Sequence, residues 1–331
     1  CVQGIYFGDI SLGTPPQSFR MLLSMAIPTV WIPNFRYSTA SRHYNHSQSS
    51  TYTVNGTAFE MKGLIAGHLS QDTMRIGELA IEHQGFVEID TINDKLLPPD
   101  TFGPCDGMFG LGFDLGGGAS QIRLPFHSLV DSGVLREPLF ALYYNNHAGQ
   151  GAMSIGATDP SHYTGELAYA EVIRQDSWTV KLDDIRVDGR NMTKHRRATF
   201  WAGYPEIQGP AAEVAALAQA VGAKRVARGP AQIYEIECSS QGPDIEILIA
   251  GARFALSKSD YTGPVLGRDG DDRVNESSDG AMCRWAIQEP FFGMDAWLFG
   301  GVFIEKVYSV FHWGDPAHDG RGRKMGFALR A

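Results

Sequence analysis

The side chains most often used for catalysis and metal binding are spread through this chain without a recognised spacing. Its ten histidines and four cysteines form neither Cys-X2-Cys nor His-Glu-X2-His, the patterns that bring metal ligands together. The acidic run Asp269–Asp272 could attract Ca²⁺, but no EF-hand loop follows it, so an exposed loop is the better interpretation. Gly116–Gly118 matches no phosphate-binding pattern and indicates a turn. We therefore expect no metal and no cofactor.

Two short apolar runs, Leu22–Asn34 and Ala198–Pro210, each enter a turn and leave as a second extended segment. An apolar pair and a glycine follow each turn, 86 residues after Ser24 and 99 residues after Trp201. This long-range repetition indicates an internal duplication rather than a short-period repeat. It predicts two lobes related by an approximate two-fold axis, with the two turns meeting at that axis.

The composition favours a mostly β protein without a nucleic-acid or membrane partner. The 331 residues carry a net charge of −9, so no basic excess exists to neutralise phosphates. No apolar stretch reaches the 18 or more residues of a membrane span. Most segments read as short strands between Gly or Pro turns. Helices are expected only within 126–135, where Gly133 ends the helix, and over 211–220.

Several motifs give the chain a specific resemblance along nearly its whole length. They are Gly-Thr-Pro-Pro-Gln at 13–17, Asp-Gly-Met-Phe-Gly-Leu-Gly at 106–112 and Asp-Pro-Ser-His-Tyr-Thr-Gly at 159–165. With these motifs the chain resembles the pepsin-like aspartic peptidases. The resemblance implies a bilobal, mostly β fold with pseudo-two-fold related lobes, the N-terminal lobe covering 1–165 and the C-terminal lobe 166–331.

Both central turns depart from that family, in which each carries Asp-Thr-Gly. Here they read Ser24-Met25-Ala26 and Trp201-Ala202-Gly203. The family's reaction needs two carboxyl groups that share one proton, so that one acts as acid and the other as base. The pKa of a serine hydroxyl is so high that the group stays protonated at any relevant pH, so it cannot serve as that base. An indole has no acid–base function. We therefore expect that the chain is not an enzyme. A Ser/His pair built on Ser24 is not expected either, because no histidine has a suitable spacing.

Two further stretches bear on this expectation. Asp131-Ser132-Gly133 is the one Asp-(Ser/Thr)-Gly string in the chain, but it lies at a predicted helix end rather than after an apolar strand. Phe59–Thr73 corresponds to the family's flap, the hairpin that folds over substrate, and is three residues short of it by our alignment. A shorter hairpin covers less of a bound peptide.

The marks of the secretory pathway are four Asn-X-Ser/Thr sequons among eight asparagines and an even number of cysteines. Four cysteines allow three pairings from the sequence alone. The resemblance implies one bridge between Cys238 and Cys283, which leaves Cys1 and Cys105 to each other. We expect a secreted protein or one of the secretory-pathway lumen, glycosylated at Asn45, Asn55, Asn191 and Asn275.

The first expectation for function is a non-catalytic binder of a protein, peptide or glycan, extracellular and monomeric, with an inhibitor-like or decoy role. The alternatives are an aspartic-type endopeptidase with a rearranged acid–base set and a structural or storage glycoprotein. The candidate cleft-lining residues are Trp31, Lys62, Gly63, Met108, Trp201 and Tyr204. Trp201 is expected either to pack in the core or to form the floor of an apolar pocket.

Overall fold

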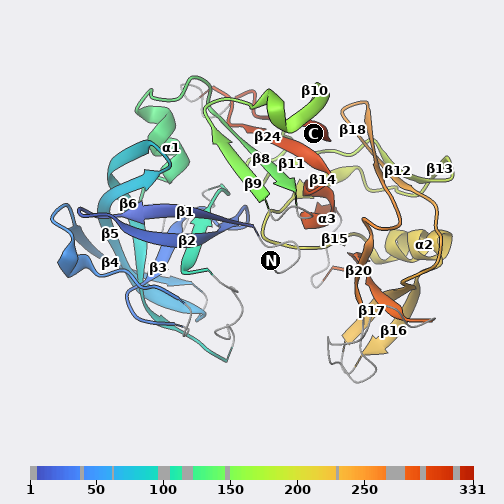
Figure 1. The fold of residues 1–331 in the computed structure, drawn as a ribbon, viewed down its shortest axis with the longest axis horizontal. Helices are drawn as coiled ribbons and strands as arrows, with labels where there is room; N and C mark the ends of the chain where they lie inside the picture. Colours follow the sequence, from blue (N-terminus) through green and yellow to red (C-terminus); the bar gives the residue numbers. More distant parts are fainter. Residues whose placement is uncertain are drawn as a thin grey trace.

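The computed structural model describes residues 6–37, 41–61, 63–95, 105–113, 122–145, 150–228, 231–265, 280–290, 296–315 and 321–331. The described chain is mostly β, as the sequence predicts. One large sheet fills one side of the molecule, smaller sheets and a helix fill the other, and a third group of strands lies between them (Figure 1).

The first half of the chain forms a seven-stranded sheet with the order β1-β2-β7-β3-β6-β5-β4. Its strands are β1 (Phe7–Leu12), β2 (Gln17–Ser24), β3 (Val30–Pro33), β4 (Thr53–Met61), β5 (Ile65–Ile76), β6 (Leu79–Ile92) and β7 (Gly107–Gly110). β7 is parallel to β2 and antiparallel to β3. The apolar pair Met108 and Phe109 therefore lies between the strand that enters the first central turn and the strand that leaves it.

The second half repeats this arrangement around the second central turn. In a five-stranded sheet of order β11-β14-β23-β15-β22, β23 is parallel to β14 and antiparallel to β15. The strands are β11 (Thr179–Lys181), β14 (Arg197–Phe200), β15 (Ile207–Gln208), β22 (Ile287–Gln288) and β23 (Trp297–Phe299). The predicted duplication is therefore present in the strand pairing of both halves.

A second five-stranded sheet, ordered β10-β25-β24-β8-β9, is built from both ends of the second half and the end of the first. It lies between the other two groups in Figure 1. Its strands are β8 (Leu139–Asn145), β9 (Gln150–Ile155), β10 (Tyr163–Glu171), β24 (Val307–His312) and β25 (Lys324–Arg330). The expected lobe boundary after residue 165 falls inside β10 and stays a prediction.

Two four-stranded sheets complete the C-terminal half. The first contains β12 (Asp184–Val187), β13 (Arg190–Asn191), β18 (Ile245–Ile249) and β19 (Ala252–Leu256). The second contains β16 (Lys224–Arg228), β17 (Ala231–Glu237), β20 (Thr262–Val265) and β21 (Met282–Trp285).

The described helices are few and short. They are η1 (His46–Gln48), α1 (Pro125–Asp131), η4 (Pro160–His162), α2 (Ala211–Val221) and α3 (Gly301–Ile304). Both predicted helices are confirmed, and α1 together with its cap residue ends directly before Gly133, the residue expected to end it. The cap residue of α1 is Ser132, so the Asp131-Ser132-Gly133 string is the end of a helix and lies in neither central turn.

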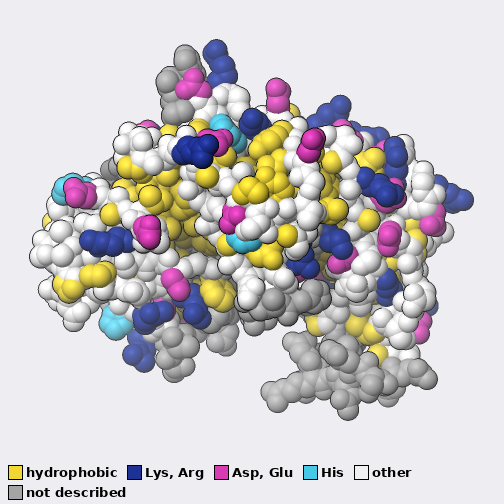
Figure 2. Space-filling model, turned by 45° about the horizontal axis from the view of Figure 1, so that its top comes forward, with side chains coloured by type: hydrophobic (Ala, Val, Ile, Leu, Met, Phe, Trp, Pro, Cys, Tyr) yellow, Lys and Arg dark blue, Asp and Glu magenta, His cyan; other side chains and the backbone are white. Residues whose placement is uncertain are grey.

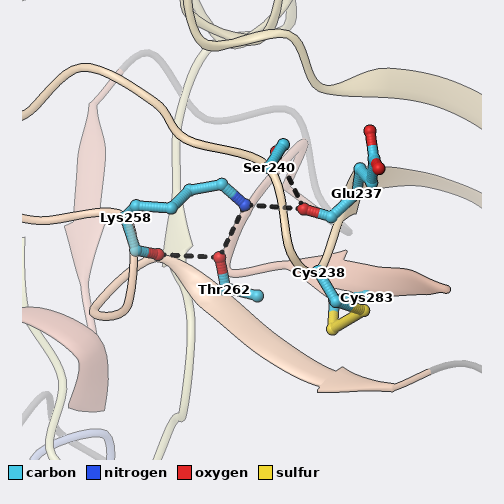
Figure 3. Close-up of a disulfide and its surroundings, with 6 residues drawn as sticks. All are labelled: Glu237, Cys238, Ser240, Lys258, Thr262 and Cys283. Atoms are coloured by element: carbon cyan, nitrogen blue, oxygen red, sulfur yellow. Dashed lines mark hydrogen bonds between the residues drawn. A yellow bond between two sulfur atoms is a disulfide. The ribbon is translucent and has the colours of Figure 1, made fainter. Parts of the chain in front are cut away.

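The Cys238–Cys283 disulfide is confirmed (Figure 3). Cys283 lies in β21, Cys238 follows β17, and these two strands pair with each other. The Lys258 ammonium group donates to the carbonyl of Glu237 at 2.8 Å and to the Thr262 hydroxyl at 3.1 Å beside the bridge. A closed loop of this length, with the two cysteines 45 positions apart in sequence, restricts the unfolded chain by about 4 kcal/mol.

The expected Cys1–Cys105 bridge stays a prediction, because Cys1 lies outside the described residues. Cys105 has no disulfide partner among the described residues and is only 5% exposed. Burial, helped by the nearby Asp106 charge, raises the pKa of Cys105 to about 11.

Within the described part of the chain, no helix is both long and apolar enough to cross a membrane. Basic and acidic side chains are interspersed on the face drawn in Figure 2, with apolar side chains between them.

Candidate functional site

The two central turns are held by the same backbone frame in each half. The Gly110 amide donates to the carbonyl of Thr29 at 3.0 Å, and the Gly300 amide donates to the carbonyl of Glu206 at 3.1 Å. Thr29 and Glu206 each stand five residues after the first residue of their turn. The apolar strands β7 and β23 thus fix both turns through equivalent hydrogen bonds.

The two turns also touch each other. Gly203 has φ +93°, and a Cβ on it would lie 2.8 Å from the carbonyl oxygen of Leu23, the residue before Ser24. Any larger residue at 203 would push the halves apart at this point. The predicted meeting of the two turns is therefore confirmed at Gly203 and Leu23.

The first turn offers a hydroxyl and otherwise apolar side chains. Ser24 is 7% exposed, and its hydroxyl oxygen accepts a hydrogen bond from the Ala26 amide at 3.3 Å. Met25 is buried in the main core, whereas Ile27 is partly buried against a smaller cluster in the N-terminal sheet. Nothing in this turn can exchange a proton near neutral pH.

The smaller apolar cluster of the N-terminal sheet brings together two of the predicted cleft-lining residues, Trp31 and Met108. Trp31 in β3 is 2% exposed, and Met108 in β7 is its strand partner and half-buried. Leu64, at the turn between β4 and β5, packs against the same cluster. The turn is tight, with the Leu64 amide donating to the Met61 carbonyl at 2.8 Å, and Gly63 is exposed within it. Lys62 lies outside the described residues.

The second turn carries an aromatic pair. Trp201 is half-buried against the main core, and its ring lies 6.2 Å from that of Tyr204, nearly parallel to it. The Trp201 amide donates to the Phe299 carbonyl at 3.0 Å, which ties the turn to β23. Trp201 thus packs partly against the core, in the first of the two roles expected for it, while keeping part of its surface exposed.

A polar network around Glu206 adjoins this pair, and the sequence analysis missed it. Glu206 is 8% exposed, forms an ion pair with Arg284 of β21, and accepts from the Tyr204 hydroxyl at 3.4 Å. The Gln208 amide donates to the same hydroxyl at 2.7 Å. Burial, followed by the Glu206 charge, raises the pKa of Tyr204 well above its ordinary range.

A signal for this network was present in the sequence. Glu206 is the one carboxylic acid in either of the two runs Leu22–Asn34 and Ala198–Pro210. Inspection of the residues beyond each turn, rather than of the first residue alone, would have singled it out. Its partner Arg284 lies 78 residues away, and no spacing rule identifies that contact.

The described residues contain no group of three or more His, Cys, Asp or Glu side chains placed to hold a metal ion. The chemistry available around the turns is therefore that of a hydroxyl, a phenol and a carboxylate. All three belong to the turns themselves or to the residues directly after them.

Comparison with known proteins defines the class. The family model for eukaryotic aspartyl protease matches residues 5–319. The chain is 33% identical to vacuolar protease A of Aspergillus fumigatus, over 94% of this chain and 77% of that protein. It is 30% identical to a renin of Echis ocellatus and 29% identical to renin of Canis lupus familiaris, each over 98% of this chain and 79–80% of the relative.

The chain therefore belongs to the eukaryotic aspartyl protease family and has its bilobal, mostly β fold. This finding corrects one expectation. The prediction that the chain is not an enzyme is wrong, because relatives 28–33% identical over nearly its full length are named as protease or renin. The residues of the two turns are still Ser24 and Trp201. Neither of these two side chains is a carboxylic acid.

Proposed function

We propose that this chain is an aspartic-type endopeptidase with a rearranged acid–base set, acting on polypeptides between its two lobes. The observation that carries the proposal is the pair of central turns, each fixed by an equivalent hydrogen bond and meeting at Gly203 and Leu23, with Glu206 as the one carboxyl group in their runs. The family membership of nearly the whole chain supports peptide hydrolysis as the reaction.

Peptide hydrolysis needs a group that takes a proton from the attacking water and a group that gives one to the leaving nitrogen. In the proposed set, the carboxylate of Glu206 accepts the proton from water. The Tyr204 hydroxyl, 3.4 Å from that carboxylate, is the neighbouring donor. Arg284 places a positive charge beside Glu206, and Ser24 contributes a hydroxyl that can hydrogen-bond the water.

The substrate side of the proposal uses the apolar residues near the turns. We assign Gly63, Met108, Trp201 and Tyr204 to the lining of the groove that receives the peptide, with the buried Trp31 packed behind Met108 as its support. Their aromatic and aliphatic character favours a substrate with large apolar side chains beside the cleaved bond. The short turn between β4 and β5 supports a groove that is less covered than that of a protein with a longer hairpin.

Digestion of a denatured protein by the purified chain between pH 3 and pH 6 tests the proposal, with products identified by mass spectrometry. Turnover is expected, and Glu206→Gln should lower it by about 10²–10⁴-fold, the usual contribution of a general acid–base group. Glu246→Gln is the matched control, because Glu246 also pairs with an arginine, Arg253, in the same half. It should leave turnover unchanged.

Two results would overturn this proposal. The first is a wild-type preparation, folded by circular dichroism, that yields no cleavage products above a buffer blank. The second is turnover that Glu206→Gln leaves unchanged, since this would remove Glu206 from the acid–base set.

We also propose that the protein is a monomeric glycoprotein of the secretory-pathway lumen or the extracellular space. The disulfide and the sequons support this location. Asn55 and Asn191 are exposed and Asn45 is half-buried, while Asn275 lies outside the described residues. Endoglycosidase treatment of protein expressed in a eukaryotic secretory host should lower its mass, and Asn55→Gln should remove one glycan. An unchanged mass would contradict the glycoprotein assignment.

A further inference from the structure

Two histidines and two carboxylates meet at the end of the N-terminal sheet, far in sequence from the central turns. This histidine–carboxylate cluster consists of His46 in η1, His68 in β5, and Glu88 and Asp90 in β6. Glu88 is fully buried, and its carboxylate lies 2.8 Å from Nδ1 of His46 and 3.4 Å from Nε2 of His68. Nδ1 of His68 lies 3.0 Å from the carboxylate of Asp90.

The imidazole of His68 therefore faces a carboxylate oxygen at each of its two nitrogens. A neutral imidazole has one N–H donor and one acceptor lone pair, so one of these carboxylates would face a lone pair. An imidazolium has two N–H donors and can serve both carboxylates. The geometry thus matches the protonated form of His68.

The other groups around Glu88 are neutral. The Ser70 hydroxyl donates to it at 3.1 Å and the Tyr52 hydroxyl at 3.4 Å. The Asn34 amide is 3.4 Å from Glu88 and donates to Asp90 at 2.6 Å. These donors satisfy oxygen lone pairs but add no positive charge.

A further carboxylate lies close by and is linked to the cluster through Tyr52. Asp72 in β5 accepts from the hydroxyls of Tyr44 and Thr51, at 2.5 and 2.6 Å, and contributes to the electrostatics of Tyr52. Among the described residues, the ion-pair partners of Glu88 and Asp90 are histidines. With neutral histidines, the two carboxylates lie two residues apart on one face of β6 without a compensating cation.

We propose that this cluster is a proton-operated clamp that stabilises the N-terminal sheet at acidic pH. Protonation of His68, together with His46, converts a pair of uncompensated carboxylates into a set of ion pairs. Because the members come from η1, β5 and β6, the clamp ties η1 and β5 to β6. An acidic environment is then the condition in which this half is most stable. The inference does not depend on the identity of the catalytic groups.

Urea unfolding with the disulfide intact, at pH 7.5 and pH 5.5, tests the clamp. On acidification, the ratio of folded to unfolded protein should increase by a factor that is about ten times larger in the wild type than in His68→Gln. This factor of ten is equivalent to about 1.4 kcal/mol in the free energy of unfolding. His43→Gln is the matched control, because His43 is exposed and lies outside the cluster. It should show the wild-type response.

If His68→Gln does not fold, Asp90→Asn gives the same test by a milder change, since Asp90 is about half exposed at its side chain. It should reduce the gain on acidification. A long-range ¹H–¹⁵N spectrum of wild-type protein at pH 5.5 should show both ring nitrogens of His68 protonated. Equal pH responses in wild type and variants, or a neutral His68 at that pH, would overturn the proposal.

Discussion

At the scale of single residues, Glu213 shows how one carboxylate can organise several elements. It lies in the first turn of α2 and accepts from the hydroxyl of Thr193, the ring and amide of His195, and the indole of Trp297. Burial by itself raises the pKa of Glu213, but these hydrogen bonds outweigh it and hold the pKa below the ordinary value of 4.5. The ionised form is therefore the one that the folded state favours.

Glu213→Gln should lower the free energy of unfolding at pH 7 by about 2–3 kcal/mol, because hydrogen bonds to a charged acceptor are lost. A lowered pKa in the folded state gives stability that is present above the unfolded value and lost as the pH falls through the folded value. The deficit of the variant should therefore shrink below pH 4.5. Urea unfolding at pH 7 and pH 3.5 measures this, with Glu246→Gln as control, and a deficit that stays constant would contradict it.

Residues that are near in sequence were the easier ones to predict. The turns at Ser24 and Trp201 and the helix over 211–221 follow from local patterns of apolar and glycine residues. The ion pairs of Glu206 and Glu88 join residues tens of positions apart. Such contacts depend on how sheets pack, which a single sequence does not state. Glu206 itself could have been found from its place after the second turn, but its pairing with Arg284 could not.

At the scale of elements, one glycine stands at the end of each of the equivalent strands β7 and β23. Gly110 is the last residue of β7, and Gly300 directly follows β23. A Cβ on Gly110 would lie 2.4 Å from the carbonyl carbon of Pro28, and one on Gly300 would lie 2.3 Å from the carbonyl oxygens of Tyr204 and Glu206. Each contact is with backbone, which cannot move aside as a side chain can. Both strands therefore need glycine where they pass a central turn.

Gly110→Ala and Gly300→Ala should each lower the free energy of unfolding by about 3 kcal/mol or more, because the clash distorts a central turn. Gly8→Ala is the control, since its Cβ would lie 3.7 Å from a side-chain carbon of Leu23, an ordinary contact. Thermal or urea unfolding compares the three variants. A loss at Gly110 or Gly300 no larger than that at Gly8 would show that the turns can adapt.

At the scale of the whole molecule, the proposed clamp and the Glu213 network act in opposite pH directions. Protonation of the histidines strengthens the N-terminal half as the pH falls, whereas protonation of Glu213 weakens the C-terminal half at lower pH. Together they favour a stability maximum on the acidic side of neutrality. The single described disulfide lies in the C-terminal half, so reduction should affect that half first.

The five-stranded sheet between the halves has two late strands of the chain at its centre. β24 and β25 follow the other three strands in sequence but lie between β10 and β8, and each pairs with one of them. A nascent chain that has already made β8, β9 and β10 must keep a space open between β8 and β10 while some 135 further residues are added, from Glu171 to Val307. This layer can close only after β24 and β25 have been synthesised, which makes the ribosome-bound chain a natural client for chaperones that shield unpaired strand edges.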